Sequence, residues 1–292
     1  MSKPADRGGI WRRAGLAAAA QVWTCTFAVV WVGCCGPDTT AAPAGIAAPK
    51  AGPASAPSTQ PAVNAIALPG IVVDPHRHEV RVEAEICIEQ GILEYLAVAD
   101  EGKTYESLFQ LHCRPSQLNA ALLMVGCIAG PVPPELRGDF APEASASAPA
   151  RPAGAPTITP PPKDYWRDAA AGPTRIAVDV EVRRPDGTWQ RRKVESFLID
   201  RGNKRPPASL TWAFTGSFFT RDEASQREVF VADVERSVIA LWYDPTAVLN
   251  LLRDVGNPYR GESNGLEVNR ASLPPIGTPV RLILRAVPAD GR

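Results

Sequence analysis

The sequence predicts a mainly β fold of the α+β class, with antiparallel strands and two short helices in one folded body over residues 70–285. Several segments alternate apolar and polar residues, which is the period of a half-buried strand. Tight-turn sequences such as Asp186-Gly187 separate some of these segments. Only two segments space their apolar residues as a helix does, so we expect strands to dominate.

The first half of the body predicts four strands. Residues 71–73 and 78–88 come first, and the longer segment places its apolar side chains on one face. Residues 93–99 and 106–112 flank Asp100-Glu101-Gly102-Lys103, which is typical of a hairpin turn.

A helix is predicted over residues 117–125, with Ser116 as its N-cap and Gly126 at its end. Its apolar stripe consists of Leu118, Ala121, Leu122 and Val125. Leu123 and Met124 make the opposite face apolar as well. We therefore expect this helix to be deeply buried.

The second half begins with a hairpin in which residues 175–183 and 189–199 pair across Asp186-Gly187. Three more strands are predicted at residues 210–220, 227–233 and 237–243. Asp244-Pro245-Thr246 then opens a second helix that ends at Gly256.

The sequence of this second unit is similar to that of the first. Aligning residues 107–126 with residues 237–256 gives six identities in twenty positions. Two related halves sharing one core are therefore one interpretation. Chance similarity between two strand-and-helix units is the other.

Residues 1–36 have the pattern of an export leader. Four basic residues precede an uncharged apolar run, Ala14–Gly33, which Cys34 follows directly. A small residue before a cysteine resembles a bacterial lipoprotein signal, so Cys34 is the candidate for lipidation. An uncleaved membrane anchor and cleavage to a secreted form are the alternatives. All three place the body outside the cytoplasm. The first two anchor it to the membrane, and the location predicted from them is the extracytoplasmic face of the bacterial cell envelope.

Two further segments are too rich in proline and too poor in large apolar residues to form a core. Residues 37–69 are predicted to be a disordered stalk, and residues 131–162 a disordered insertion with ten prolines. Residues 286–292 form a short tail. Without residues 1–36 the chain holds 27 basic and 30 acidic side chains. A weakly acidic body argues against nucleic acid as a partner, because binding to its phosphates needs a positive field.

Spaced blocks of residues resemble the YdjY domain family. The blocks are Leu93-Glu94 to Ala99, Gly102-Lys103, Glu106-Ser107, Pro115-Ser116, Ala121-Leu122-Leu123, Phe214-Thr215-Gly216-Ser217, Ala232-Asp233, Asp244-Pro245, Leu273-Pro274-Pro275 and Gly277-Thr278-Pro279-Val280. The resemblance covers most of residues 70–285 and implies an exported or membrane-attached bacterial protein of unknown activity. The family pattern has a histidine before Glu106, where this chain has Tyr105, so no His-Glu pair is carried over.

Few residues offer catalytic or metal chemistry. The chain has no CxxC, HExxH, P-loop or GxSxG motif, and no cofactor is predicted. His76, His78, His112 and Cys113 are weak candidates for a metal site, against the plainer interpretation of exposed turn histidines. The body cysteines, Cys87, Cys113 and Cys127, allow one disulfide at most, and three buried free thiols are the plainer expectation.

Two charged groups remain. Glu94, Lys103 and Glu106 could serve acid–base chemistry, although charges beside a hairpin usually only keep it solvated. Five basic residues flank the Asp186-Gly187 turn and are the candidate contacts for an anionic envelope component. They are Arg183, Arg184, Arg191, Arg192 and Lys193. A solvated charged face is the competing interpretation, and on either one we expect charge reversal here to leave the fold intact.

The function predicted from these observations is a membrane-tethered envelope protein whose body is a non-catalytic binding or scaffolding module. A metal-binding or redox-associated envelope protein, using His76, His78, His112 and Cys113, is the alternative.

Overall fold

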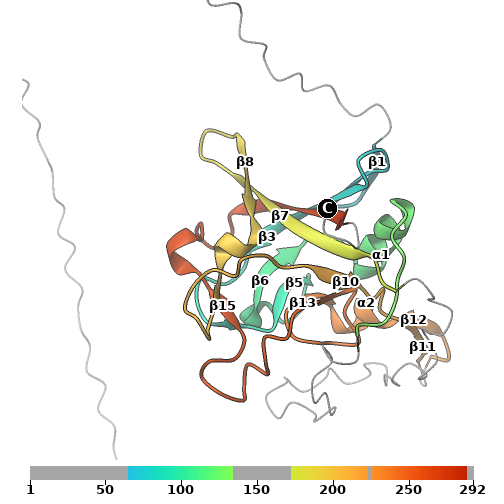
Figure 1. Ribbon diagram of the computed structural model, residues 1–292. Helices are drawn as coiled ribbons and strands as arrows, with labels where there is room; N and C mark the ends of the chain where they lie inside the picture. Colours follow the sequence, from blue (N-terminus) through green and yellow to red (C-terminus); the bar gives the residue numbers. More distant parts are fainter. Residues whose placement is uncertain (1–64, 134–171, 223–224, 288–292) are drawn as a thin grey trace, which may run out of the picture. The chain divides into compact units, whose positions relative to one another are not determined.

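The computed structural model describes residues 65–133, 172–222 and 225–287, which form a mainly β structure (Figure 1). Eight strands make a sheet that closes into a barrel, because the last strand in the order, β6, pairs with the first, β3. In order around the barrel the strands are β3 (Glu79–Ile86), β16 (Pro279–Val287), β7 (Arg175–Arg183), β10 (Trp212–Phe214), β14 (Leu249–Leu251), β13 (Ser237–Ala240), β5 (Tyr95–Ala99) and β6 (Ser107–Leu111).

Shorter elements surround the barrel. The sheet continues beyond β3 through β2 (Ile71–Asp74) to β1 (Ile66–Leu68), and β8 (Trp189–Lys193) pairs with β7. Two small sheets pair β11 (Phe219–Arg221) with β12 (Glu228–Phe230), and β15 (Leu266–Val268) with both β4 (Ile92–Leu93) and β9 (Leu198–Asp200). The helices of the described residues are α1 (Pro115–Met124), α2 (Val231–Glu235) and the short 3-10 turns η1 (Thr104–Glu106), η3 (Val194–Phe197) and η4 (Arg270–Ser272).

Alternating strands build the barrel core as the sequence predicts. In β3, Val80 and Val82 are fully buried, and Val82 lies opposite the equally buried Leu282 of β16. The antiparallel pairing of β7 with β8 confirms the hairpin around Asp186-Gly187. The prediction of a mainly β, largely antiparallel fold is therefore confirmed.

Two pairs of barrel strands run parallel, which the sequence did not indicate. Strands β5 and β6 are parallel neighbours, and so are β13 and β14. The predicted hairpin across residues 100–103 is therefore wrong: the connection runs back along β5 through η1 and enters β6 in the same direction. Parallel neighbours usually need a longer crossover.

Helix α1 forms where it is predicted and ends at Met124, and Gly126, with a φ of +86°, follows its C-cap residue Val125. Arg114, not Ser116, occupies the N-cap position. Ser116 instead donates two hydrogen bonds to Asp233 of α2, from its amide at 2.8 Å and from its hydroxyl at 2.7 Å. Leu123 and Met124 are 50% and 45% exposed, so only one face of α1 is buried and the expectation of deep burial is wrong.

The second predicted helix is absent from the described residues 244–256. This segment instead supplies β14, and α2 forms earlier, where it overlaps the end of the strand predicted at residues 227–233. The sequence similarity between residues 107–126 and 237–256 therefore corresponds to similar structure in strands β6 and β13. It does not in the segments that follow, because helix α1 follows β6 whereas strand β14 follows β13. The strand predicted at residues 210–220 is divided into β10 and β11 by Gly216 and Ser217, both with positive φ.

The boundaries of the body differ slightly from the prediction. Strand β1 lies within the predicted stalk, and β16 extends to Val287, within the predicted tail. The leader, residues 37–64 of the stalk and residues 134–162 of the insertion lie outside the described residues.

Candidate functional site

Glu94, Lys103 and Glu106 come together because β5 and β6 are parallel. Glu94 lies between β4 and β5, Lys103 precedes η1, and Glu106 is the last residue of η1. The returning connection brings Glu106 beside Glu94, whose amide donates a hydrogen bond of 3.0 Å to the Glu106 carbonyl oxygen. The amide of Leu241, which follows β13, donates 2.8 Å to the Glu94 carbonyl oxygen. Three segments of the barrel thus meet at Glu94.

The lysine bridges the two carboxylates. Lys103 Nζ lies 3.4 Å from Glu106 Oε1 and 3.8 Å from Glu94 Oε2. It also lies 5.4 Å from the centre of the Tyr95 ring, within the range of a cation–π contact. The carboxylate side chains are only 14% and 12% exposed. The expectation of solvated charges beside a hairpin is therefore wrong.

Burial and charge perturb the acid–base behaviour of this group. Burial, and then the charge of Glu94, raise the pKa of Glu106 to about 7, although Lys103 opposes the shift. Burial alone would lower the pKa of Lys103, but Glu106, Glu94 and Asp244 together raise it. At neutral pH the lysine is therefore charged, and Glu106 is close to half ionised.

Two exposed tyrosines border the carboxylates. The Tyr259 hydroxyl donates a hydrogen bond of 3.3 Å to Glu106 Oε2. Burial, then Glu106, raise the pKa of the Tyr105 phenol, which therefore lies within reach of the same charges. The two tyrosine side chains are 56% and 61% exposed. They offer ring surface beside a buried polar centre.

Asp244 completes the site from the connection between β13 and β14. Its Oδ2 accepts a hydrogen bond of 2.9 Å from the Tyr95 hydroxyl. Its amide donates 2.8 Å to Oδ1 of the fully buried Asn250, whose Nδ2 donates 2.9 Å back to the Asp244 carbonyl oxygen. Asn250 Nδ2 also donates 3.0 Å to Thr215 Oγ1. Tyr95 thus holds the carboxylate of Asp244, and Asn250 holds its backbone from inside the barrel.

We call this group the Glu–Lys–Glu site and define it as Glu94, Tyr95, Lys103, Tyr105, Glu106, Asp244 and Tyr259. Sequence reasoning singled out its two glutamates and its lysine. It did not assign the other four, Tyr95, Tyr105, Asp244 and Tyr259, to this site, and the last two reach it from distant segments. The parallel pairing of β5 and β6 brings Glu94 and Glu106 together. The antiparallel pairings of β13 with β5 and of β15 with β4 bring in the connections that carry Asp244 and Tyr259.

The basic hairpin is divided between two faces of β8. Arg191 and Lys193 lie 3.0 and 3.2 Å from the carboxylate of Asp179. Arg192 points the other way, donates 2.8 Å to the Ser272 carbonyl oxygen and stacks on Phe197, with its guanidinium 4.2 Å from the ring centre. Arg183 and Arg184 are exposed at the turn, where Arg184 donates to Gln190. The five candidate cations therefore do not converge on one surface.

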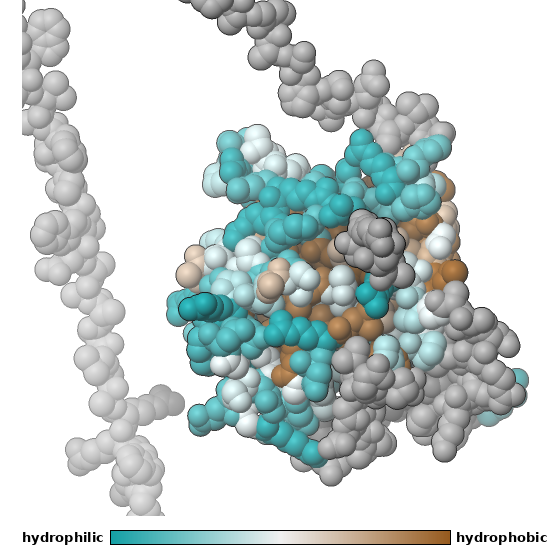
Figure 2. All heavy atoms as spheres, viewed as in Figure 1, coloured by the Kyte–Doolittle hydropathy of each residue, from teal (hydrophilic) through white to brown (hydrophobic). Residues whose placement is uncertain are grey.

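Asp179 is the centre of an ion-pair network on the outer face of the sheet. Arg285 Nη2 lies 2.7 Å from Asp179 Oδ2, in addition to Arg191 and Lys193. Burial alone would raise the pKa of Asp179, but its hydrogen bonds to Lys193 and Arg191 hold it below its usual value. Figure 2 shows polar residues covering this hairpin, with hydrophobic residues gathered below it.

The weak metal candidates are not brought together. His78 Nδ1 lies 2.9 Å from the Val125 carbonyl oxygen, whereas His112 lies 3.7 Å from Asp100 and 4.0 Å from Glu85. In the part of the chain that the structure describes, no group of three or more His, Cys, Asp or Glu is arranged to hold a metal ion.

The body cysteines are free thiols. Burial raises the pKa of Cys87 and of Cys113 to about 12, and that of Cys127 to about 11. Because the thiolate is the reactive form, none of the three is activated.

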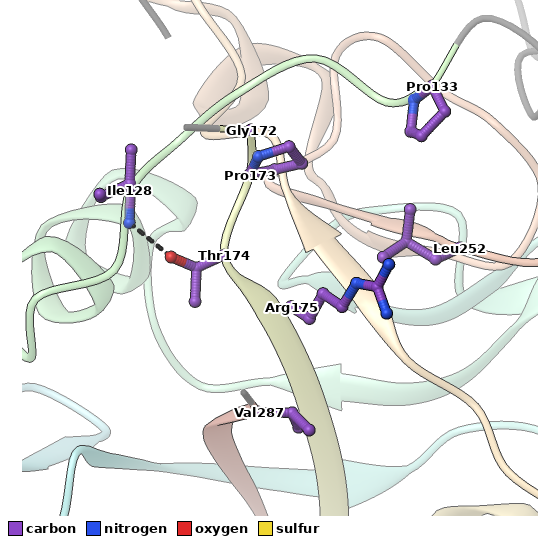
Figure 3. Close-up of a pocket in the computed structure, with 8 residues that line it drawn as sticks. All are labelled: Ile128, Pro133, Gly172, Pro173, Thr174, Arg175, Leu252 and Val287. Atoms are coloured by element: carbon purple, nitrogen blue, oxygen red, sulfur yellow. Dashed lines mark hydrogen bonds between the residues drawn. The ribbon is translucent and has the colours of Figure 1, made fainter. Parts of the chain in front are cut away.

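A cavity of about 380 Å³ lies elsewhere, and none of its lining residues belongs to the Glu–Lys–Glu site (Figure 3). It is mostly apolar and is lined by Ile128, Pro133, Gly172, Pro173, Thr174, Arg175, Leu252 and Val287. The Thr174 hydroxyl accepts a hydrogen bond of 2.8 Å from the Ile128 amide, which closes one wall. Apart from Thr174 and Arg175, the side chains that line the cavity are apolar or absent, so they form no cluster of polar groups. We therefore place the candidate site at the glutamates.

The fold and this site define a mainly β barrel protein with a perturbed acid–amine centre at one edge. Comparison of the chain with protein-family models, with curated proteins and with solved structures finds no match. None of the described helices is both long and apolar enough to cross a membrane.

Proposed function

We propose that this chain is a bacterial cell-envelope protein, tethered to the membrane by its N-terminus, whose barrel is a non-catalytic binding module. The leader pattern with Cys34 supports the tether. The resemblance to the YdjY domain family, which stays a prediction, points to the same location. Glu94, Lys103, Glu106 and Asp244 belong to separate blocks of that resemblance and meet in the Glu–Lys–Glu site.

The observation that carries the binding function is a fixed, charged centre beside exposed tyrosine side chains: Tyr259 contacts Glu106, and Tyr105 precedes it in η1. Lys103 and Tyr259 hold the carboxylates in place through contacts of 3.3 to 3.8 Å. The raised pKa values of Lys103 and Tyr259 leave neither group as a base or nucleophile at neutral pH. Tyrosine provides contact area at little cost in side-chain entropy, which suits recognition.

The alternative metal or redox function has less support. His78 and His112 contact different partners, and the thiol of Cys113 has a pKa of about 12. An anionic envelope component at the basic hairpin stays a secondary proposal, because Arg191 and Lys193 already pair with Asp179.

The tether is tested by metabolic labelling with a palmitate analogue. We expect the label to be lost in Cys34→Ser and kept in the matched control Cys35→Ser. Equal labelling of both variants would contradict lipidation at Cys34.

The binding function is tested by sedimenting the purified Cys34→Ser chain with isolated cell envelopes. We expect sedimentation to fall severalfold in Tyr105→Ala/Tyr259→Ala. Ile276→Ala is the control, because Ile276 is similarly exposed, at 56%, and lies outside the site. Equal sedimentation of all three proteins would overturn the assignment of binding to this site.

A further inference from the structure

The cavity of about 380 Å³ lies on the outer face of the barrel, where β7 begins and β16 ends. Arg175 and Val287 lie opposite each other in these two strands, and residues paired in this way project to the same face of a sheet. The exposed Arg175 is followed by the fully buried Ile176, so this face is the one turned away from the core. Clefts of roughly 300–1,000 Å³ with a mostly apolar lining and few polar groups are typical ligand sites. The cavity therefore has the size and the lining of such a site.

Hydrogen bonds fix one wall of the cavity. The Ile128 amide donates 2.8 Å to the Thr174 hydroxyl, and the Thr174 amide donates 2.9 Å back to the Ile128 carbonyl oxygen. The Gly130 amide donates 3.0 Å to the Phe214 carbonyl oxygen of β10. An added Cβ at Gly130 would lie only 2.9 Å from the backbone nitrogen of Pro173, so these two segments are closely packed. The wall is thus formed without a ligand, which lowers the cost of ordering on binding.

The lining suits an alkyl chain that carries one anionic group. Its apolar side chains are those of Ile128, Pro133, Pro173, Leu252 and Val287. Arg175 is the single charged residue among the described residues that line the cavity, and its side chain extends toward Leu252 (Figure 3). A guanidinium has five N–H donors and pairs with carboxylates and phosphates through two parallel hydrogen bonds. Since an apolar cavity of about 150 Å³ holds benzene, 380 Å³ suits a ligand of about ten to fifteen non-hydrogen atoms.

We propose that this cavity binds a single alkyl chain with an anionic head group, in which the chain lies against the apolar lining and the head pairs with Arg175. The ligand is an amphiphile of about ten carbons, and its head is a carboxylate or a phosphate. This site is separate from the Glu–Lys–Glu site, so the inference goes beyond the proposed function and does not rest on it.

The experiment is calorimetric titration of the purified Cys34→Ser chain at pH 7 with decanoate and with decyl phosphate, each below the concentration at which it forms micelles. Decyltrimethylammonium is the control with the same chain and the opposite charge. We expect saturable binding of one anion per chain and at least tenfold weaker binding of the cation. Octanoate, which is two methylenes shorter, should bind about tenfold more weakly than decanoate. The tighter of the two anions identifies the head group.

Variants of the lining locate the ligand. Arg175→Gln is expected to weaken decanoate binding about tenfold. Arg183→Gln is its matched control, because Arg183 is the equally exposed residue at the other end of β7. Leu252→Trp fills the cavity and should abolish binding, whereas Ile276→Trp adds the same ring at an exposed position outside the cavity and should not. Ile128→Trp, at a side chain that is already 51% exposed, narrows the cavity without disturbing the core and should weaken binding severalfold.

Circular dichroism verifies that each variant is folded, and Ile128→Trp decides the test if Leu252→Trp is not. Equal binding of decanoate and decyltrimethylammonium, or binding that Arg175→Gln leaves unchanged, would overturn the inference. Binding that the folded cavity variants leave unchanged would place the ligand elsewhere and would also overturn it. If neither anion binds, the inference fails, and the occupant to test next is the chain's own segment 134–171, which begins and ends beside the cavity at Pro133 and Gly172.

Discussion

The hydroxyl of Tyr259 donates a hydrogen bond to Oε2 of Glu106 over 3.3 Å, although 153 positions separate the two residues. This bond joins the loop before β15 to the edge of the barrel. The buried Pro258 and Arg201, which donates 2.6 Å to the Asn264 carbonyl oxygen, fasten the same loop. Tyr259 is therefore held beside the carboxylates by more than its own hydrogen bond.

The first prediction concerns pH and stability. The pKa of Glu106 is raised in the folded chain to about 7, from 4.5. The contribution of Glu106 to the free energy of unfolding is therefore fully present below 4.5, the pKa of Glu106 in the unfolded chain. This contribution is lost as the pH rises through about 7, its pKa in the folded chain. Glu106→Gln cannot ionise and so avoids this loss of stability. It should raise Tm at pH 8 by about 2–4 °C, which corresponds to roughly 1 kcal/mol in the free energy of unfolding after allowance for solvent screening. At pH 5 the two proteins should melt within about 1 °C of each other.

Thermal melts at pH 5 and pH 8 measure this difference, with Glu101→Gln as the exposed control. A Glu106→Gln variant that is less stable than wild type at pH 8 would contradict the raised pKa. The same result in Glu101→Gln would point to a general effect of net charge.

The second prediction concerns Asn250. Its fully buried side chain links Thr215 to both backbone groups of Asp244. Asn250→Ala leaves those buried groups unpaired and should cost about 2–4 kcal/mol in urea unfolding. Asn203→Ala removes a single exposed bond to the Arg205 amide and should cost less than about 0.5 kcal/mol. Similar losses in the two variants would show that the Asn250 network contributes little.

The third prediction compares two glycines with positive φ. At Gly216, φ is +73° and an added Cβ would lie 2.9 Å from Ala129 Cβ. At Gly187, φ is +84° and no atom lies within 4 Å of an added Cβ. Both alanine variants strain the backbone by about 1–2 kcal/mol, but only Gly216→Ala also crowds its neighbours. Chemical denaturation should therefore show a further loss of about 1–3 kcal/mol in Gly216→Ala. Equal losses would mean that the segment around Ala129 moves freely.

The sequence predicts the fold well where one strand face is buried and the other is solvated. Strands β3 and β7 alternate for eight and nine residues, so their period is unambiguous. The hairpin of β7 and β8 also carries its own turn, Asp186-Gly187.

The error at the second helix has a specific cause. Leu249, Asn250 and Leu251 are all buried, so β14 lacks the alternation that identifies a strand. The apolar spacing around it fits a helix equally well. Strands β10 and β13 supply hydrogen-bond partners on both sides of β14, and this long-range pairing decides its conformation.

The candidate site was only partly predictable for a similar reason. Glu94, Lys103 and Glu106 lie close in sequence, so their proximity could be inferred. Their burial could not, because it depends on Leu241 beside Glu94 and on the loop that carries Tyr259. The first contact follows from the pairing of β13 with β5 and the second from the pairing of β15 with β4, and neither long-range pairing has a local sequence signal.

The last prediction departs from the sequence-based expectation that charge reversal in the basic hairpin leaves the fold intact. Arg191 Nε lies 3.0 Å from Asp179 Oδ2, and its Nη2 lies 3.7 Å from Glu79 Oε2. Both carboxylate side chains are only 6% exposed. Arg191→Glu would place a third carboxylate beside two that are almost buried, which should cost about 2–4 kcal/mol.

Arg184→Glu is the matched control on the same hairpin. Arg184 is exposed and donates 3.2 Å to Gln190, so its reversal should change stability by less than about 0.5 kcal/mol. Urea unfolding at pH 7 measures both variants, and a series at 0.05 and 0.5 M salt separates screened from buried pairs. Because the Asp179 and Glu79 side chains are almost buried, most of the loss in Arg191→Glu should persist at the higher salt. A loss that disappears with salt, or one equal to that of Arg184→Glu, would show that Arg191 belongs to a solvated face and remains available to an anionic ligand.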